Sequence, residues 1–242
     1  MTTSGAELRP GTLYLIPNLL GETSIERALP QQVAAVTARL KHFLVEDEKS
    51  ARRLIKRLHP STDLRSLSIE RLNEHTKADA LRNLIAPLSQ GNDLGIISEA
   101  GCPAIADPGS DIVRLAHSLG ARVVPLVGPC SMILALMASG MNGQRWRFVG
   151  YIPVEGVERK TEIENLDRLA FNTAETQIMM DTPYRNQKLL SDLIAWCRPQ
   201  TQLCVAQGLT TEEEWIKTAP IAAWRTASCE LKKIPTLFLL GR

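Results

Sequence analysis

Short apolar runs alternate with amphipathic helical stretches through the first half of this 242-residue chain. The runs lie at residues 12–17, 42–47, 94–98 and 121–128, with a weaker one at 63–69. Helical periodicity covers residues 31–40, 49–58, 77–90 and 111–119. Apolar strands alternating with helices are typical of an α/β protein, so we expect a mostly parallel sheet with helices on both faces.

The second half has more strands per residue. A helix is expected from Cys130 to the closing Gly140, with further helices at 158–170 and 185–195. Strands are expected at residues 145–153, 176–183, 202–208 and 236–241. This order predicts a second α/β domain with a mixed sheet, and we divide the chain into residues 1–126 and 127–242.

Charge gives the whole chain little attraction for a polyanion, because 28 basic residues face 26 acidic ones. An aromatic content of 5% also argues against a surface rich in base stacking. Any contact with nucleic acid would therefore need a local patch. The densest basic run, residues 49–59, predicts a helix with one basic face, for which a solvated surface is the simpler interpretation.

Cysteine and histidine spacing indicates neither a disulfide framework nor a metal site. The cysteines are odd in number and form no C-x-x-C pair, and the four histidines are scattered. No basic region followed by an apolar run opens the chain, and no apolar window reaches the ~20 residues of a membrane span. These features predict a soluble, cytoplasmic protein with reduced thiols and no metal.

The run GIISEAGCPAIADPG, residues 95–109, carries several glycines and prolines directly after a predicted strand. Glycine permits positive φ, and proline fixes φ and removes a donor, so the loop is expected to be rigid. One interpretation is a cradle that binds a small ligand through main-chain groups. The alternative is a tight crossover in which Asp107 caps the next helix and Pro108 starts it.

Ligands of parallel α/β sheets bind beyond the carboxyl ends of the strands, where this loop and three others lie. The chain lacks G-x-G-x-x-G, G-x-x-x-x-G-K-[ST] and G-x-S-x-G, which disfavours the common nucleotide sites and hydrolases. Acids near strand ends are candidates for orienting a substrate or accepting a proton, although each could instead cap a helix. They are Glu46, Asp47, Glu99, Asp107 and Asp181, with Asn73, Glu74 and His75 as a further polar group.

Five motifs in order resemble the tetrapyrrole methylase superfamily of SAM-dependent methyltransferases. Residues 98–109, SEAGCPAIADPG, are similar to S-D-A-G-T-P-x-I-x-D-P-G, and VGPCS at 127–131 resembles the family's P-G-P-C-A. VED, NEHTKA and RFVGYIP, beginning at residues 45, 73 and 147, resemble A-E-D, N-E-x-x-K-A and R-F-x-G-F-L-P. Within the superfamily the chain is most similar to the ribosomal small subunit methyltransferase I family, which methylates a cytidine ribose.

The resemblance implies two α/β domains that bind SAM in the cleft between them, usually in a homodimer. Carried over by position, the first domain would contact SAM through Leu20, Cys102 and Ile105. Cys130 and Ser131 would meet it at the joint between the domains. The second domain would add Met180, Gln207 and Pro235.

The chain departs from the family pattern on the substrate side. NLLGE at 18–22 replaces T-P-I-G-N, and Glu48 stands where the family has a small hydroxyl residue. AQGLT at 206–210 replaces A-R-E-L-T, so an arginine suited to phosphate becomes Gln207. The printed chain also ends just after its last predicted strand, without the family's C-terminal extension. These changes leave the cofactor side intact and alter the substrate side, as in a paralogue, so the acceptor stays open between RNA and a small molecule.

Methyl transfer from SAM depends mainly on alignment of the nucleophile and exclusion of water. For a hydroxyl acceptor, Glu46 and Glu99 are the preferred candidates for accepting the proton, ahead of Glu74 and Asp181. The acceptor is RNA in the first hypothesis, with Lys49, Arg52, Arg53 and Arg57 as a candidate basic surface. The alternatives are a tetrapyrrole or other metabolite as acceptor, and a SAM-binding regulator without catalysis.

Overall fold

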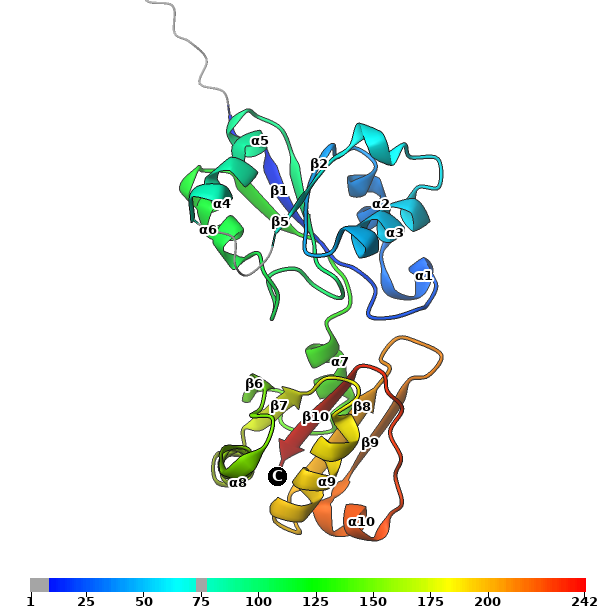
Figure 1. Ribbon diagram of the computed structural model, residues 1–242, viewed down its shortest axis with the longest axis vertical. Helices are drawn as coiled ribbons and strands as arrows, with labels where there is room; N and C mark the ends of the chain where they lie inside the picture. Colours follow the sequence, from blue (N-terminus) through cyan, green and yellow to red (C-terminus); the bar gives the residue numbers. More distant parts are fainter. Residues whose placement is uncertain (1–8, 73–77) are drawn as a thin grey trace, which may run out of the picture. The chain divides into compact units, whose positions relative to one another are not determined.

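The chain forms two compact units, Met1–Pro129 and Cys130–Arg242 (Figure 1). The computed structural model describes residues 9–72 and 78–242. Each unit has its own five-stranded sheet and its own buried core. In the part of the chain that is described, no helix combines the length and the apolar character needed to span a membrane.

The sheet of the first unit is parallel throughout, as expected, with the strand order β3-β2-β4-β1-β5. Its strands are β1 (Thr12–Ile16), β2 (His42–Val45), β3 (Ser68–Arg71), β4 (Leu94–Ile97) and β5 (Arg122–Pro125). All four residues of the central β4 are buried. Gly95 fits this interior because a Cβ there would lie 2.7 Å from Ile16 Cδ1.

Helices cover both faces of this sheet (Figure 1). They are α1 (Ile25–Ala28), α2 (Gln31–Thr37), α3 (Glu48–Leu58), η1 (Leu64–Ser66), α4 (Ala78–Leu84), α5 (Ala86–Ser89) and α6 (Ser110–Ser118). Phe43 and Val45 of β2 pack with α2 and α3, whereas Leu44 between them packs with α4 to α6. This alternation follows from the two-residue period of a strand and confirms the expected arrangement.

Two expected elements of the first unit differ in the structure. The helix predicted over 77–90 is two short helices, α4 and α5, because Pro87 has no N–H to continue the first. The weak strand predicted at 63–69 begins only at Ser68. Asp63 accepts a hydrogen bond from the Arg65 amide over 3.0 Å and so starts the turn of η1 instead.

The sheet of the second unit is mixed, also as expected, with the order β6-β7-β10-β8-β9. Its strands are β6 (Trp146–Tyr151), β7 (Thr176–Met180), β8 (Gln202–Gln207), β9 (Trp215–Pro220) and β10 (Thr236–Gly241). β6 and β7 run parallel, and the other pairs are antiparallel. The sequence did not predict β9, an edge strand whose side chains are exposed or half-buried.

The helices of the second unit are α7 (Ser131–Ser139), α8 (Gly156–Thr173), α9 (Asn186–Trp196) and α10 (Ile221–Thr226). The core joins side chains of α8, α9 and α10 to one face of the sheet, including Phe238 and Leu240 of β10. α7 packs against β8, β9 and β10 and ends at Gly140 with φ 71°, the left-handed closure expected from the sequence. α10 was not predicted.

Candidate functional site

The carboxyl ends of the first unit's strands share one edge of the sheet, and the side chain of Asn18 joins the loops there. Asn18 follows β1 and is 5% exposed. Its Nδ2 lies 2.9 Å from Ser50 Oγ and 2.9 Å from the Glu99 carbonyl oxygen. The backbone N–H of Asn18 donates to the Gly101 carbonyl oxygen over 2.8 Å. Asn18 was not among the predicted site residues; its signal is an amide side chain placed directly after a buried strand.

The two preferred candidate bases, Glu46 and Glu99, are brought together at this edge. Glu46 follows β2 and Glu99 follows β4, and these strands are neighbours in the sheet. The Glu99 amide donates to Glu46 Oε2 over 3.0 Å. The neighbouring acid Asp47 has a capping role, because its carboxylate accepts from the Ser50 amide at the start of α3 over 2.7 Å.

Asp107 adds a third carboxyl group to this pair. Burial and, after it, the charge of Glu46 raise its pKa to about 6, with a smaller contribution from Glu99 and an opposite effect of the Ser98 hydroxyl. Glu46, Glu99 and Asp107 therefore form an acidic cluster in which Asp107 keeps its proton up to a pH of about 6.

The loop that carries Asp107 has an unusual backbone. Gly101, Ala104, Ala106 and Gly109 have φ values of 70°, 63°, 61° and 138°. The left-handed region costs an alanine about 1–2 kcal/mol, so the surrounding contacts must hold this conformation. The loop therefore has the constrained backbone that its glycines and prolines predicted, and its rigidity stays a prediction.

The predicted helix cap in this loop is wrong. α6 begins at Ser110, and its N-cap is Gly109, without a side-chain hydrogen bond. Asp107 lies two residues before that cap and Pro108 one residue before it. The φ of 138° at Gly109 is accessible mainly to glycine, and it turns the chain into the helix without help from a side chain.

A pocket of about 470 Å³ opens beside this loop, next to the start of α6. Its lining combines the apolar Leu72, Leu81 and Ile112 with residues 104 and 106–111. Asp107 belongs to this lining, but Leu20, Cys102 and Ile105 do not. The pocket is therefore distinct from the predicted cofactor contacts.

The predicted cofactor residues of the first unit lie on the loops after β1 and β4. A Cβ at Gly101 would lie 3.2 Å from Leu20 Cδ2, so the Leu20 side chain sits directly against the loop after β4. Cys102 Sγ lies 3.4 Å from the Pro129 carbonyl oxygen and 3.7 Å from that of Gly128. Ile105 is 47% exposed. The structure thus brings Leu20 and Cys102 to one edge of the sheet and leaves Ile105 at the surface.

Three predicted cofactor residues of the second unit share one edge of its sheet. Met180 ends β7, Gln207 ends β8, and Pro235 directly precedes β10, the strand between these two. Both polar atoms of the Gln207 side chain are hydrogen-bonded within the unit. Nε2 donates to the Lys232 carbonyl oxygen over 2.9 Å, and Oε1 accepts from the Lys232 backbone N–H over 3.2 Å. The Gln207 side chain is therefore not available to a ligand. Cys130 and Ser131 lie at the start of α7.

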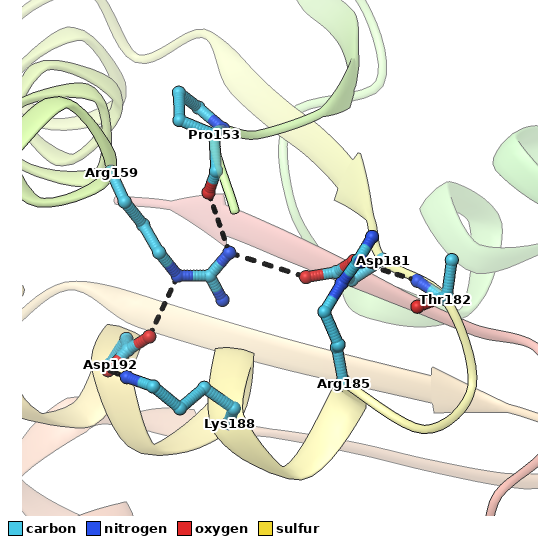
Figure 2. A network of polar contacts seen from close by, with 7 residues as sticks. All are labelled: Pro153, Arg159, Asp181, Thr182, Arg185, Lys188 and Asp192. Carbon is cyan, nitrogen blue, oxygen red and sulfur yellow. Dashed lines mark hydrogen bonds and ion pairs between the residues drawn. The ribbon is translucent and has the colours of Figure 1, made fainter. Parts of the chain in front are cut away.

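Asp181, the further candidate base after β7, belongs to a buried ionic network (Figure 2). Its side chain is 1% exposed and lies between Arg159, at 3.3 Å, and Arg185, at 2.7 Å. Arg159 also donates to Asp192 over 2.8 Å and to the Pro153 carbonyl over 2.8 Å. These contacts give Asp181 a structural role. Asn73, Glu74 and His75 lie outside the described residues.

The candidate basic surface on α3 is partly neutralised by acids of the same unit. Arg52 lies 3.4 Å from Glu48, and Arg53 lies 2.7 Å from Glu22. Arg57 lies 3.5 Å from Glu22 and donates to the Thr23 carbonyl. Because Glu22 and Glu48 stand at positions where the sequence departs from the family pattern, these departures weaken the positive field of α3.

Comparison with known proteins places the chain among methyltransferases. The ribosomal RNA small subunit methyltransferase I of Pseudomonas aeruginosa is 30% identical over 216 residues, which cover 88% of this chain and 71% of that protein. The protein of the same name from Vibrio cholerae serotype O1 is 29% identical over 210 residues, or 87% of this chain and 69% of that protein. No family model matches the chain.

Two solved structures share the fold. The methyltransferase CobJ is 18% identical with a TM-score of 0.62, covering 96% of this chain and 94% of that one. Uroporphyrin-III C-methyltransferase from Thermus thermophilus, complexed with S-adenyl homocysteine, is 16% identical with a TM-score of 0.54, covering 96% of this chain and 98% of that one. The chain therefore belongs to the ribosomal RNA small subunit methyltransferase I family, is a methyltransferase, and shares its fold with these two enzymes.

Proposed function

We propose that this methyltransferase modifies a hydroxyl group of RNA. The observation that carries the proposal is the cluster of Glu46, Glu99 and Asp107 at the same sheet edge as Leu20 and Cys102, in a chain whose relatives are named for ribosomal RNA. A hydroxyl acceptor loses its proton as the new bond forms, so it needs a carboxylate of this kind nearby.

The loops after β1 and β4 suit an adenosyl group. Leu20 and the exposed Ile105 offer apolar surface, and the constrained backbone around Cys102 offers main-chain polar groups. In our proposal Leu20, Cys102 and Ile105 contact SAM from the first unit. From the second unit the proposed contacts are Cys130, Ser131, Met180, Gln207 and Pro235, which lie at the start of α7 and at one edge of the sheet.

When bound, SAM supplies an activated methyl group. The residues of the chain align the acceptor, exclude water and receive the acceptor proton. Glu46 is oriented for that last role, because the Glu99 amide holds one of its carboxylate oxygens and leaves the other for the acceptor. Glu99 is exposed and is the second candidate.

The direct test has two parts. Calorimetry measures binding of SAM and S-adenosylhomocysteine to the purified protein, and labelled SAM follows methyl transfer to small-subunit ribosomal RNA isolated from a strain that lacks the protein. We expect both ligands to bind and the RNA to gain label at a ribose. Binding of SAM without any transfer to RNA would contradict the proposed acceptor.

A small-molecule acceptor is the second candidate. It is favoured by the acids that neutralise α3 and by the internal commitment of Gln207, which replaces an arginine of the family pattern. Labelled transfer to a metabolite extract but not to RNA would support it. Salt dependence of RNA binding separates the two further, because phosphate contacts weaken steeply with salt.

We also propose a homodimer in the cytoplasm. The dimer follows from the family resemblance and is tested by light scattering, in which a mass near 26.7 kDa would indicate a monomer instead. No disulfide joins the cysteines within the described residues, which fits a reducing compartment. Fractionation of cells that express the tagged protein tests its location.

A further inference from the structure

Arg185 is held in place by a buried carboxylate of the second unit. Its Nε donates to Asp181 Oδ1 over 2.7 Å, and Asp181 in turn contacts the buried Arg159 (Figure 2). The backbone amide of the next residue, Thr182, also donates to Asp181 Oδ1 over 2.8 Å. Arg159, which also donates to Asp192, contacts the other oxygen of Asp181 and holds that carboxylate in place, so the guanidinium of Arg185 is oriented before any ligand arrives.

The outer edge of that guanidinium is available to a ligand. The Arg185 side chain is 30% exposed, and its two terminal nitrogens form no hydrogen bond within the part of the chain that the structure describes. The hydrogen bond with Asp181 raises the pKa of Arg185, which keeps it charged. A guanidinium fixed at Nε presents its other donors as a fork, the geometry that binds a phosphate with two hydrogen bonds.

Two exposed tyrosines lie in the same part of the second unit as Arg185. Tyr184 is 70% exposed, and its ring centre lies 5.4 Å from Arg185 Cζ. Tyr151, at the end of β6, is 60% exposed and is paired in register with Met180, the residue before Asp181. A bulge between Phe148 and Gly150 sets the register that pairs Tyr151 with Met180. Rings this exposed contribute little to the core of the unit.

We propose that Tyr151, Tyr184 and Arg185 form a docking site for a single-stranded segment of the acceptor RNA, in which the rings stack on bases and Arg185 binds a phosphate. The site rests on the proposed function, since it presumes an RNA acceptor. Stacking on tyrosine and phosphate binding by arginine are the usual means of recognising unpaired RNA. The low aromatic content of the chain does not oppose a site built from only two rings.

The test uses the full chain and a fluorescent single-stranded oligoribonucleotide of small-subunit ribosomal RNA sequence. Fluorescence anisotropy gives its affinity, and calorimetry gives the affinity for SAM. The double variant Tyr151→Ala/Tyr184→Ala is expected to bind the oligonucleotide at least 10-fold more weakly, because each stacked base contributes about 1–3 kcal/mol. SAM affinity is expected to change less than about 2-fold, since neither tyrosine is among the proposed SAM contacts.

Matched variants separate stacking from folding and charge. Tyr151→Phe/Tyr184→Phe keeps both rings and should retain RNA affinity, while Trp146→Ala at the opposite end of β6 removes a half-exposed ring outside the site and should also retain it. A plot of log affinity against log salt concentration has a negative slope, and Arg185→Met should make that slope less steep by about one. Arg168→Met, on the exposed surface of α8, should leave the slope unchanged.

The outcomes distinguish this inference from the function on which it rests. Unchanged RNA affinity in the double alanine variant, with wild-type RNA methylation intact, would overturn the docking site alone. Loss of affinity in the double phenylalanine variant as well would show that the rings do not act by stacking and would also overturn it. A wild-type protein that binds SAM but neither binds nor methylates RNA would overturn the proposed acceptor.

Discussion

The Glu99 backbone amide donates a hydrogen bond to the Glu46 carboxylate, with 3.0 Å between Glu99 N and Glu46 Oε2. The contact is possible because β2 and β4 are parallel neighbours whose last residues, Val45 and Ile97, are paired in register. It restricts the Glu46 side chain to one orientation at the sheet edge. A carboxylate held in this way is better suited to accept a proton than one that turns freely in solvent.

Replacing Glu46 by glutamine should lower the rate of methyl transfer while keeping the fold. The amide oxygen of the substituted side chain would still accept from Glu99 N, but that side chain would no longer take up a proton. Loss of a general base typically costs about 10²–10⁴-fold in rate, so we expect kcat to fall within that range for Glu46→Gln. Steady-state kinetics with labelled SAM measure the effect.

The control for this variant is Glu48→Gln, two residues further along. Glu48 is exposed in the first turn of α3 and pairs only with Arg52, at 3.4 Å, among the residues that the structure describes. Its loss should change kcat less than about 2-fold, since exposed pairs of this kind contribute under about 1 kcal/mol. Equal activity of Glu46→Gln and the wild-type protein would remove Glu46 from the reaction and leave Glu99 to be tested in the same way.

Asp107 makes the stability of the protein depend on pH. Its pKa is about 6 in the fold against 3.8 for an unperturbed aspartate, so the folded state binds the proton more tightly than the unfolded chain. The free energy of unfolding therefore falls as the pH rises from about 4 to about 6, and the cost of the charge is complete above that range. Asp107→Asn should be more stable than the wild-type protein at pH 7–8 by about 1 kcal/mol, after allowance for solvent screening, and equal to it near pH 4.

Thermal unfolding between pH 4 and pH 8 measures this difference, which corresponds to about 2–4 °C for a chain of this size. Asp111→Asn is the control, because Asp111 is exposed and loses only a surface pair with Arg114, at 2.7 Å. That variant should be slightly less stable than the wild-type protein. If the difference in stability between Asp107→Asn and the wild-type protein does not depend on pH, the raised pKa of Asp107 is contradicted.

The first sheet was predictable because each of its inner strands is an uninterrupted apolar run. β9 was not, because it is an edge strand that pairs on one side only and carries the exposed polar residues Lys217 and Thr218, so no apolar run marks it. The cap at Asp107 was mispredicted for a different reason. Several residues before α6 are suited to a helix start, and only the backbone shows that Gly109 takes the position.

The candidate site was predictable as a set of loops but not as a set of contacts. The acids after β2 and β4 were found because parallel strands end at one edge. The sequence also marked Gln207 as a lost arginine, yet its role depends on Lys232 and Thr236, which no local pattern connects to it. Asn18 was missed for the same reason, since the partners of its Nδ2 lie 32 or more residues further along the chain.

The buried network of the second unit should be sensitive to loss of its central cation. Arg159 is 1% exposed, and Arg159→Met leaves the buried carboxylates Asp181 and Asp192 without that partner. Breaking a buried ion pair typically costs about 3–5 kcal/mol, and the remaining contacts of Arg185 and Lys188 should keep the loss near the lower value. Urea unfolding measures the change.

The neighbouring Lys160→Met is the matched control. Lys160 is exposed on α8 and pairs with Glu164 over 3.7 Å, so its removal should cost less than about 0.5 kcal/mol. If Arg159→Met unfolds at the same urea concentration as Lys160→Met, the network contributes no stability. In that case the contact with Arg159 would not be what holds Asp181, and with it Arg185, in a fixed orientation.

Gly128, after β5, should not tolerate even one added methyl group. A Cβ at this position would lie 2.2 Å from Pro17 Cβ and 2.4 Å from Pro17 Cγ, and a proline ring has no rotamer with which to move aside. Gly128→Ala must therefore push apart the loops after β1 and β5, at a cost of about 1–3 kcal/mol and with weaker SAM binding, because the first of these loops carries Leu20. Gly143→Ala is the control, since a Cβ there meets nothing within 4 Å. Calorimetry with SAM and thermal unfolding compare the two, and equal SAM affinities would separate these loops from the cofactor site.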